Sequence, residues 1–203
     1  MPVQPKPTIE FWYEFASTYS YLAAMRIETL ARNAGVKVVW RPFLLGPIFR
    51  AQGWDDSPFN LYPVKGRYML RDMQRLCKRQ NLRFQLPEQF PANGLTAARV
   101  AIVGAAQGWI APFSREIYLR QFAKGQDISD RQIIEAVLDD LGLTGAPIIE
   151  AAGELAIKDQ LRKQTERAQN IAIFGAPSFT TSDGELFWGN DRLEDALDWV
   201  QNL

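Results

Sequence analysis

The sequence predicts an α/β protein in which one sheet is built from the two ends of the chain and a long all-helical segment is inserted between them. Strand-like segments occur only near the ends, and the residues between them repeat apolar side chains at helical spacing. With 203 residues, of which 47% are hydrophobic and 23% charged, the chain can bury one substantial core. We therefore expect one globular unit.

The chain begins with a strand, a helix and a second strand. Residues 8–15 are dense in aromatic and β-branched types, with more apolar side chains than a half-exposed strand carries, so they predict a buried strand. Residues 17–34 repeat apolar positions at helical spacing, and Gly35 supplies a left-handed stop. Residues 36–45 predict a second strand, which a right-handed crossover places parallel to the first.

A helical insertion follows the second strand. Short breaks separate five segments with helical periodicity, which are 61–80, 94–107, 110–124, 130–142 and 153–171. We assign residues 47–173 to a helical insertion domain, and residues 1–46 together with 174–203 to the sheet domain.

The C-terminal part returns to strands. Residues 178–188 predict a β-hairpin around the turn formed by Asp183 and Gly184. The last segment places Asp191 and Glu194 in capping-box spacing and continues as an amphipathic helix. Strand, helix, strand, helical insertion, hairpin and helix is the order of a thioredoxin-like fold with an inserted helical domain.

Charge and hydropathy exclude several partners. Lys plus Arg equals 23 and Asp plus Glu equals 23, so no net field attracts a nucleic acid or an anionic membrane. No run reaches the roughly 20 apolar residues of a membrane span, and the first residues lack an apolar signal region. We expect a cytoplasmic protein whose partner is a small molecule or a second copy of itself.

Two residue types are nearly absent. The sequence has no histidine, which removes the usual general base near neutral pH and the commonest zinc ligand. The only cysteine is Cys77, inside a helical segment, so no intramolecular disulfide and no thiolate cluster can form. We expect Cys77 to pack in the core and the protein to bind no metal.

Ser17 and Ser20 lie at the start of the first helix, where redox proteins of the thioredoxin-like fold carry Cys-x-x-Cys. Serine is a favoured N-cap, so Ser17 has an ordinary structural interpretation. The free N–H groups of a helix N-terminus also form an anion site, to which the Ser17 hydroxyl adds a donor. Both interpretations stay open.

Two further motifs also allow both a structural and a functional interpretation. Pro177 in "FGAPSF" is either an ordinary proline at the start of a strand or the cis-proline of a thioredoxin-like fold, in which case Ala176 faces Ser17. Asn190 and Asp191 in "FWGNDRL" are either helix caps or, at a second helix N-terminus, groups that hold a zwitterionic ligand.

Four motifs together resemble the 2-hydroxychromene-2-carboxylate isomerases and the related kappa-class glutathione transferases. They are "FASTYSYLA", "PVKGRYMLRDM", "FGAPSF" and "WGNDRL", and the resemblance extends over essentially the whole chain. It implies a thioredoxin-like domain with a DsbA-type helical insertion, bound glutathione and a homodimer. One departure is Thr18, which replaces the proline of the Ser-Pro-[Tyr/Phe]-Ser pattern common in the family and weakens the preorganised helix start slightly.

The resemblance also implies site residues. Ser17 matches the active serine, Ala176 before Pro177 matches the residue whose backbone pairs with the cysteinyl unit of glutathione, and Trp188, Gly189, Asn190 and Asp191 match the γ-glutamyl site. Phe49, Asn60 and Phe90 fall near substrate-contact positions. The aromatic residues Phe43, Phe49, Trp54 and Phe90 are candidates for an aryl pocket, and Arg50, Lys65 or Arg67 for binding a carboxylate, although core packing and solvated surface charge are their ordinary roles.

These residues lead to a mechanism in which the ligand supplies the missing sulfur. A free thiol has a pKa of roughly 8.5, and lowering it by about 2 units requires about 2.7 kcal/mol. A hydroxyl bonded to a charged acceptor contributes about 1.5 to 3 kcal/mol, and a helix N-terminus about 0.3 to 1 kcal/mol. Without a histidine base, Ser17 is a poor nucleophile, so we assign it as a donor to the glutathione thiolate.

The predicted function is glutathione-dependent conversion of 2-hydroxychromene-2-carboxylate to trans-o-hydroxybenzylidenepyruvate in aromatic hydrocarbon catabolism, such as naphthalene degradation. The alternatives are a kappa-class glutathione transferase or peroxidase with other electrophiles, and a non-enzymatic, redox-inactive binding module. A disulfide oxidoreductase is excluded, because Cys77 alone forms no dithiol.

Overall fold

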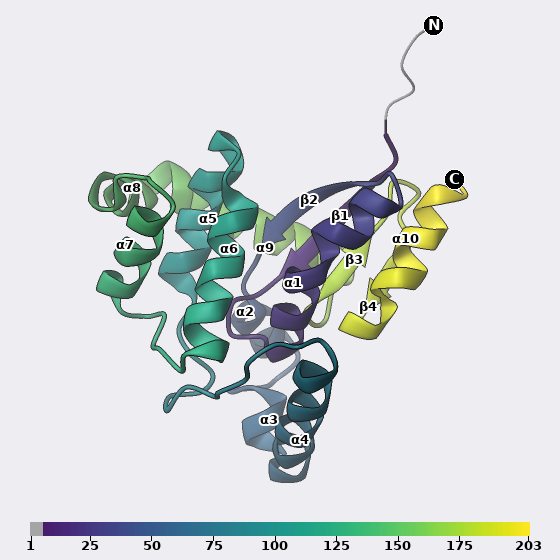
Figure 1. The fold of residues 1–203 in the computed structure, drawn as a ribbon, viewed down its shortest axis with the longest axis horizontal. Coiled ribbons are helices and arrows are strands. Elements are labelled where there is room, and N and C mark those ends of the chain that lie inside the picture. Colours follow the sequence, from purple (N-terminus) through teal and green to yellow (C-terminus); the bar gives the residue numbers. More distant parts are fainter. Residues whose placement is uncertain (1–5) are drawn as a thin grey trace, which may run out of the picture.

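The computed structural model describes residues 6–203 and contains a four-stranded sheet of order β2-β1-β3-β4 (Figure 1). The strands are β1 (Thr8–Tyr13), β2 (Lys37–Pro42), β3 (Ser178–Thr180) and β4 (Leu186–Trp188). β1 pairs with β2 in parallel and with β3 antiparallel, and β3 pairs with β4 antiparallel. The two ends of the chain therefore share one sheet, which confirms the predicted thioredoxin-like α/β fold.

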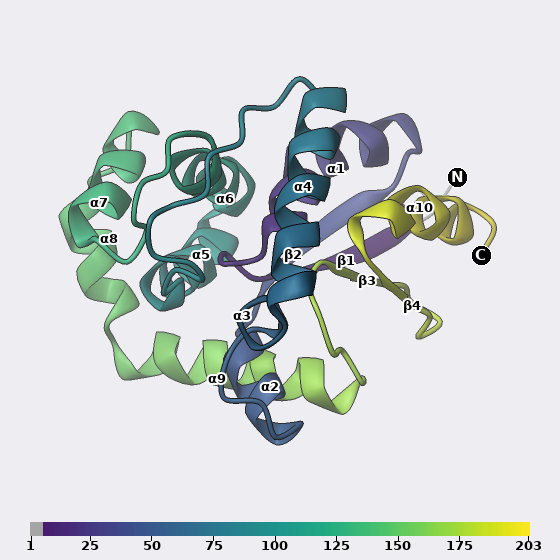
Figure 2. The same cartoon turned by 90° about the horizontal axis from the view of Figure 1, so that it is seen from below.

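Helices cover both faces of the sheet (Figure 2). The helices α1 (Thr18–Asn33) and α10 (Leu193–Gln201) pack on one face, and α2 (Leu45–Ala51) and α9 (Leu155–Asn170) lie on the other. Successive side chains of β1 point alternately to these two faces of the sheet. Phe11 belongs to the main core beneath α1, whereas Trp12 joins a second buried cluster with Ile48 of α2 and Ala168 of α9.

The segment between β2 and β3 is helical, as predicted. Besides α2 and α9 it contains α3 (Pro58–Leu61), α4 (Pro63–Arg79), α5 (Leu95–Gln107), α6 (Ile110–Tyr118), the π-helical turn η1 (Leu119–Ala123), α7 (Arg131–Asp140) and α8 (Gly145–Ala152). Phe11 of the sheet and Phe113 of α6 belong to the same buried cluster. Because one core joins both parts, the division of the chain at 46/47 and 173/174 stays a prediction.

The end of the second strand and the short helices α2, α3 and α8 differ from the sequence prediction. The second strand ends at Pro42 rather than at residue 45, because the Leu44 N–H turns away to bond the Thr165 hydroxyl of α9 at 3.2 Å, and α2 begins one residue later. The eight residues of α8 were not predicted, since a helix this short carries little periodicity.

The predicted capping box of the last helix is wrong. A short 3-10 turn, η2 (Asn190–Arg192), precedes α10, and Arg192 is the N-cap with no side-chain bond. Glu194 instead forms an ion pair with Arg26 of α1, whose Nε also donates to Asn190 Oδ1 at 3.2 Å. Arg26 of α1 thus holds both η2 and α10, through a hydrogen bond and an ion pair, in place of the local cap.

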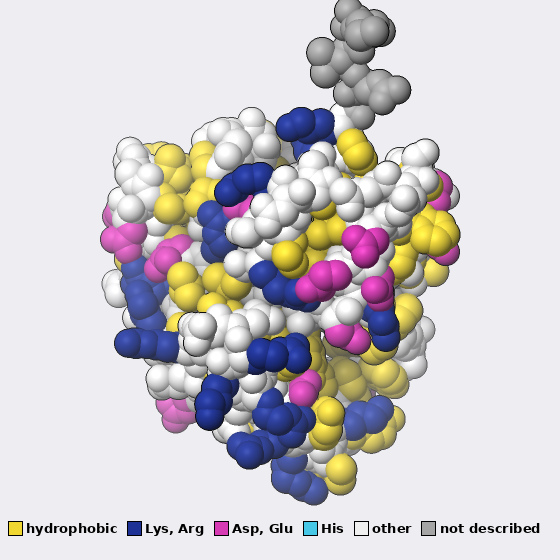
Figure 3. All heavy atoms as spheres, turned by 45° about the vertical axis from the view of Figure 1, so that its right-hand side comes forward, with side chains coloured by type: hydrophobic (Ala, Val, Ile, Leu, Met, Phe, Trp, Pro, Cys, Tyr) yellow, Lys and Arg dark blue, Asp and Glu magenta, His cyan; other side chains and the backbone are white. Residues whose placement is uncertain are grey.

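The balanced charge of the chain is unevenly distributed over the surface. Lys and Arg side chains gather over the part of the molecule that contains α3 and α4, at the bottom of Figure 3. The α4 sequence contributes Lys65, Arg67, Arg71, Arg75, Lys78 and Arg79. Within residues 6–203, no helix has the length and apolar character needed to cross a membrane.

Candidate active site

A cavity of about 1140 Å³ lies between the sheet and the helical insertion. Ligand sites commonly have volumes of roughly 300 to 1,000 Å³, so this cavity can hold a peptide cofactor and a second small molecule. Its sheet-side half consists of the start of α1, residues 174–177 and residues 188–192, and its helix-side half consists of α2, residues 52–59, α4 and residues 90–95. The predicted site residues that line it are Ser17, Ala176, Pro177, Trp188, Gly189, Asn190, Asp191, Phe49, Arg50, Lys65 and Phe90.

Ser17 forms two hydrogen bonds at the start of α1. It is the N-cap of α1, and its Oγ accepts a hydrogen bond from the Ser20 N–H at 3.2 Å. The same hydroxyl donates to the backbone oxygen of Ala176 at 2.9 Å. The Ala176–Pro177 peptide bond is cis, as predicted. The hydroxyl therefore points across the cavity wall toward the segment that was expected to face it.

The rest of the sheet-side half is shaped by glycines. Gly175 packs against the indole of Trp188 so closely that a Cβ would overlap it, and Trp188 lies against the Phe174 ring with centroids 4.8 Å apart. Gly189 has a φ of +114°, a conformation that favours glycine, and its N–H donates to the Pro177 oxygen at 3.0 Å. This hydrogen bond fixes the 188–192 turn beside the cis-proline.

Asn190 and Asp191 occupy different environments. Asn190 is buried and held by Arg26, whereas the Asp191 side chain is 75% exposed at the cavity rim. The only ion-pair partner of Asp191 among the described residues is Arg192, at 3.7 Å. Asp191 is therefore available to a cationic group of a ligand. The Asn190 side-chain oxygen is held by Arg26, and its ligand contact stays a prediction.

Aromatic side chains form part of the helix-side half. Phe49 and Trp54 lie with ring centroids 5.6 Å apart, and both line the cavity together with Phe90. Phe43 does not: it is fully buried against Trp12 on the covered face of the sheet. Of the four predicted aryl-pocket residues, Phe43 is thus a core residue.

Of the predicted polar residues of this half, some line the cavity and others do not. Arg50 and Lys65 line the cavity, whereas Arg67, two residues further along α4, does not. Asn60 also lies outside the lining, because its side-chain amide donates to Asp56 at 2.9 Å and to the Phe90 oxygen at 3.5 Å. The structure does not bring Asn60 to the cavity wall, and its substrate contact stays a prediction.

Sequence reasoning did not identify six charged cavity residues, which are Glu14, Asp55, Asp56, Asp72, Arg79 and Arg192. Burial raises the pKa of Glu14 to about 8, despite a hydrogen bond that its carboxyl accepts from the Ala16 N–H at 3.1 Å. The available signal was position: Glu14 follows the buried strand directly and comes three residues before Ser17.

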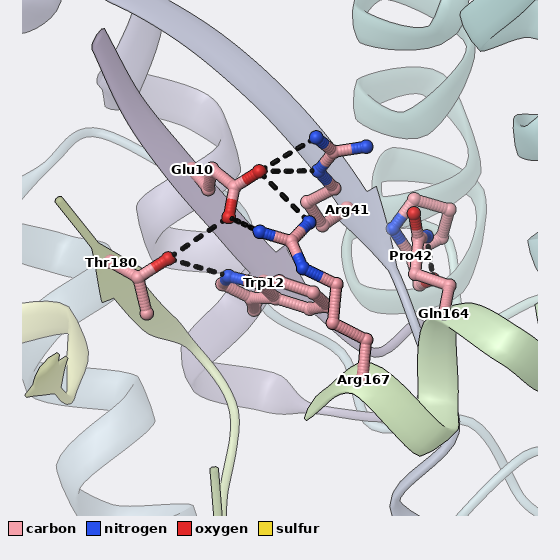
Figure 4. A network of polar contacts seen from close by, with 7 residues as sticks. All are labelled: Glu10, Trp12, Arg41, Pro42, Gln164, Arg167 and Thr180. Atoms are coloured by element: carbon pink, nitrogen blue, oxygen red, sulfur yellow. Dashed lines mark hydrogen bonds and ion pairs between the residues drawn. The ribbon is translucent and has the colours of Figure 1, made fainter. Parts of the chain in front are cut away.

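A polar network outside the cavity lining ties α9 to the sheet (Figure 4). Glu10 of β1 accepts hydrogen bonds from Arg41 and Arg167, each with a contact of 2.6 Å, and from Thr180 at 3.2 Å. Thr180 in turn accepts from the Trp12 indole at 2.9 Å. Burial by itself raises the pKa of Glu10, but the hydrogen bonds and charges of Arg167 and Arg41 outweigh it and leave the pKa below its usual value.

Comparisons with known proteins agree with the thioredoxin-like fold. A family model described as a DSBA-like thioredoxin domain matches residues 8–201. The chain is 29% identical over 188 residues to a 2-hydroxychromene-2-carboxylate isomerase of Sphingobium xenophagum, covering 92% of this chain and 94% of that protein. It is 28% identical over 203 residues to glutathione S-transferase kappa 1 of Homo sapiens, covering 92% and 88%.

Among solved structures, a 2-hydroxychromene-2-carboxylate isomerase matches with a TM-score of 0.86 at 22% identity, covering 96% of this chain and 95% of that chain. The likeness extends over the whole sheet and the helical insertion. The curated relatives are isomerases and glutathione transferases, which supports an enzyme. The chain belongs to the family of DSBA-like thioredoxin domains, with relatives named 2-hydroxychromene-2-carboxylate isomerase and kappa-class glutathione transferase.

Proposed function

We propose that the protein is a glutathione-dependent isomerase that converts 2-hydroxychromene-2-carboxylate to trans-o-hydroxybenzylidenepyruvate. The observation that carries the proposal is the Ser17 hydroxyl at the N-terminus of α1, 2.9 Å from the Ala176 oxygen, in a cavity that is lined by neither cysteine nor histidine. A site with a thiolate donor and no thiol of its own requires a ligand that brings one. The isomerase of Sphingobium xenophagum, 29% identical, supports this reaction.

The sheet-side half fits the chemistry of glutathione. Neither the Ala176 N–H nor the first-turn N–H groups of Thr18 and Tyr19 donate a hydrogen bond to another described residue, so all three are available to a ligand. The Ala176 backbone can pair with an extended peptide, and the N–H groups of α1 favour an anion. The exposed Asp191 carboxylate suits the ammonium of a γ-glutamyl group.

When bound, glutathione would supply a sulfur nucleophile for addition to the conjugated carbon of the opened substrate, and this sulfur would leave after rotation about the former double bond. The Ser17 hydroxyl turns from Ala176 to donate to the sulfur and favours its ionised form. The free N–H groups of α1 add to that effect. Ser17 is thereby a hydrogen-bond donor and not a nucleophile.

The helix-side half fits an aromatic 2-oxo acid. Phe49, Trp54 and Phe90 offer flat apolar surface for the aryl ring. Arg50 and Lys65 offer positive charge for its carboxylate. The cavity volume of about 1140 Å³ leaves space for both ligands at once.

The test is an isomerisation assay with purified protein, with and without glutathione. We expect conversion that depends on glutathione and leaves its concentration unchanged, because the thiol is regenerated. S-methylglutathione is the matched control, since it can occupy the site without an ionisable thiol. Equal rates with and without glutathione would contradict the proposal.

A kappa-type transferase is the second candidate, and the 28% identity to glutathione S-transferase kappa 1 favours it. It uses the same Ser17 site with a different electrophile. Turnover of a halogenated nitroarene, measured beside the chromene substrate, distinguishes the two. A binding module without activity predicts that calorimetry detects no glutathione binding.

We further propose a homodimer, on the resemblance to this family. Sedimentation velocity of the purified protein tests it, and a monomer at micromolar concentration would contradict it.

A further inference from the structure

The Glu14 carboxyl lies in the cavity wall and has no part in the reaction as described so far. It follows β1 directly, and its backbone oxygen accepts the Ser17 N–H at 3.0 Å. Both residues line the cavity. Glu14 and Ser17 therefore belong to one turn that faces the bound ligands.

The two carboxyl oxygens of Glu14 have different surroundings. Oε2 accepts the Ala16 N–H at 3.1 Å. Oε1 has no hydrogen-bond partner among residues 6–203, and it lies toward the 90–95 segment, where a Cβ added to Gly94 would be 3.4 Å from it. The Ala16 N–H thus fixes Oε2 as an acceptor, which leaves Oε1 to carry a proton.

Among residues 6–203, no Lys or Arg side chain forms an ion pair with the Glu14 carboxyl. The titratable side chain that contacts the residue from another element is Tyr118 of α6, whose hydroxyl donates to the Glu14 backbone oxygen at 2.9 Å and whose own pKa is raised by burial, by Tyr13 and by Glu14. The charged cavity residues of α2, α4 and the turn before α10 form no ion pair with Glu14; they are Arg50, Lys65, Asp72, Arg79, Asp191 and Arg192. A carboxyl that is desolvated and unpaired keeps its proton, which agrees with its raised pKa of about 8.

We propose that Glu14 is the proton donor of this cavity, giving the proton on Oε1 to the carbonyl oxygen of the bound 2-oxo acid and taking it back later in the cycle. This role rests on the proposed isomerase function. When sulfur adds to the conjugated carbon, the electron pair of the double bond shifts and the carbonyl oxygen takes the proton of Glu14. When the carbon–sulfur bond breaks, the carbonyl re-forms and its proton returns to Glu14, so no other reagent is consumed.

A direct titration of the parent protein tests the protonation state without any turnover. Protein labelled with ¹³C at glutamate carboxyls is followed by NMR from pH 4 to 10, with Glu14→Gln and Glu14→Asp to assign the signal. We expect the Glu14 carboxyl to titrate near pH 8. Titration near pH 4, the ordinary range of a glutamate, would overturn the proposal even if a variant failed to fold.

The pH profile of isomerisation tests the role in the reaction. We expect the rate of the parent to rise as the thiolate forms and to fall as Glu14 loses its proton. Glu14→Gln keeps the size of the side chain and its contact with the Ala16 N–H, but it cannot transfer a proton. The isomerisation rate of this variant should therefore fall by a factor of about 10². Its pH profile should also lack the decrease at alkaline pH. Glu14→Asp should retain that fall. Glu10→Gln, a change on β1 outside the cavity lining, should retain both limbs.

The failures are distinguishable. A parent that shows no glutathione-dependent isomerisation overturns the proposed function, and with it the role of Glu14. A parent that is active, with an unchanged rate and alkaline fall in Glu14→Gln, overturns the role of Glu14 alone.

Discussion

The two halves of the cavity are built by different means. In the sheet-side half, backbone geometry holds the functional groups: Ser17 caps α1 and bonds Ala176, and Gly189 bonds Pro177. In the helix-side half, side chains such as Phe49 and Trp54 come from a short helix and the irregular segment after it. The backbone framework suits glutathione, which both proposed functions share. The side-chain wall suits the second ligand, in which the two proposed functions differ.

The largest effect is expected for Ser17→Ala, in the sheet-side half. We expect kcat/KM of isomerisation to fall about tenfold or more near neutral pH, because one pKa unit of the bound thiol corresponds to 1.36 kcal/mol. Loss of the cap alone costs about 1 kcal/mol of stability and leaves catalysis nearly normal. Ser20→Ala, at a buried position one turn on, is the control and should retain most of the activity.

The next effect is expected for Asp191→Asn at the rim of the same half. We expect the dissociation constant of glutathione, measured by calorimetry, to rise about tenfold, because a hydrogen bond to a charged group contributes about 1.5 to 3 kcal/mol. The melting temperature should not change, since Asp191 does not cap α10. Asp195→Asn, an exposed change on α10 outside the cavity, is the control, and equal affinity losses in both variants would remove Asp191 from the site.

A smaller effect is expected for Lys65→Met in the helix-side half. We expect the KM of the chromene carboxylate to rise severalfold with the glutathione affinity unchanged, since an exposed charge pair contributes about 0.2 to 1 kcal/mol. Arg67→Met removes a charge from the same helix outside the cavity and should leave the KM as it is. If both changes raise the KM alike, the general field of α4 binds the substrate, and Lys65 has no special contact.

No effect on ligand binding is expected for Glu10→Gln, because none of the residues drawn in Figure 4 lines the cavity. The effect is on stability instead. The folded-state pKa of Glu10 lies below its usual value, so the ionised form stabilises the fold above the unfolded pKa of about 4.3, and this contribution is lost as the pH falls through the folded pKa. We expect Glu10→Gln to lower the unfolding free energy at pH 7 by about 1 to 3 kcal/mol.

The difference between Glu10→Gln and the parent should shrink as denaturant titrations are repeated at lower pH. A difference that stays constant from pH 7 to pH 3 would contradict the assignment of this stability to the Glu10 carboxylate.

The contrast between the halves also explains what the sequence could predict. The sheet-side residues lie in local patterns: a strand followed by Ser17, a proline before a strand, and a glycine after Trp188. Short-range backbone rules are sufficient to recognise such patterns. The wall around Phe49 was only partly predicted, because a side chain such as Phe43 or Asn60 is directed by contacts with residues distant in sequence.

The errors have the same origin. The predicted capping box does not form because Arg26, more than 160 residues earlier in the chain, donates a hydrogen bond to Asn190 and forms an ion pair with Glu194. Glu14 was overlooked because its environment depends on Gly94 and on burial that no local pattern records. Tertiary contacts therefore decide the helix-side half and the protonation state of the site, whereas local sequence decides the framework.

The thiolate titration of bound glutathione, followed by ultraviolet absorbance, tests the central claim most directly. Burial raises the pKa of Cys77 to about 11, so the protein contributes little thiolate signal below that range. We predict that the bound thiol of the parent titrates at least one unit below the free value of roughly 8.5, and that Ser17→Ala raises this pKa by one or more units. If the bound thiol titrates like free glutathione in the parent, or at the same pH in both proteins, Ser17 is only a helix cap.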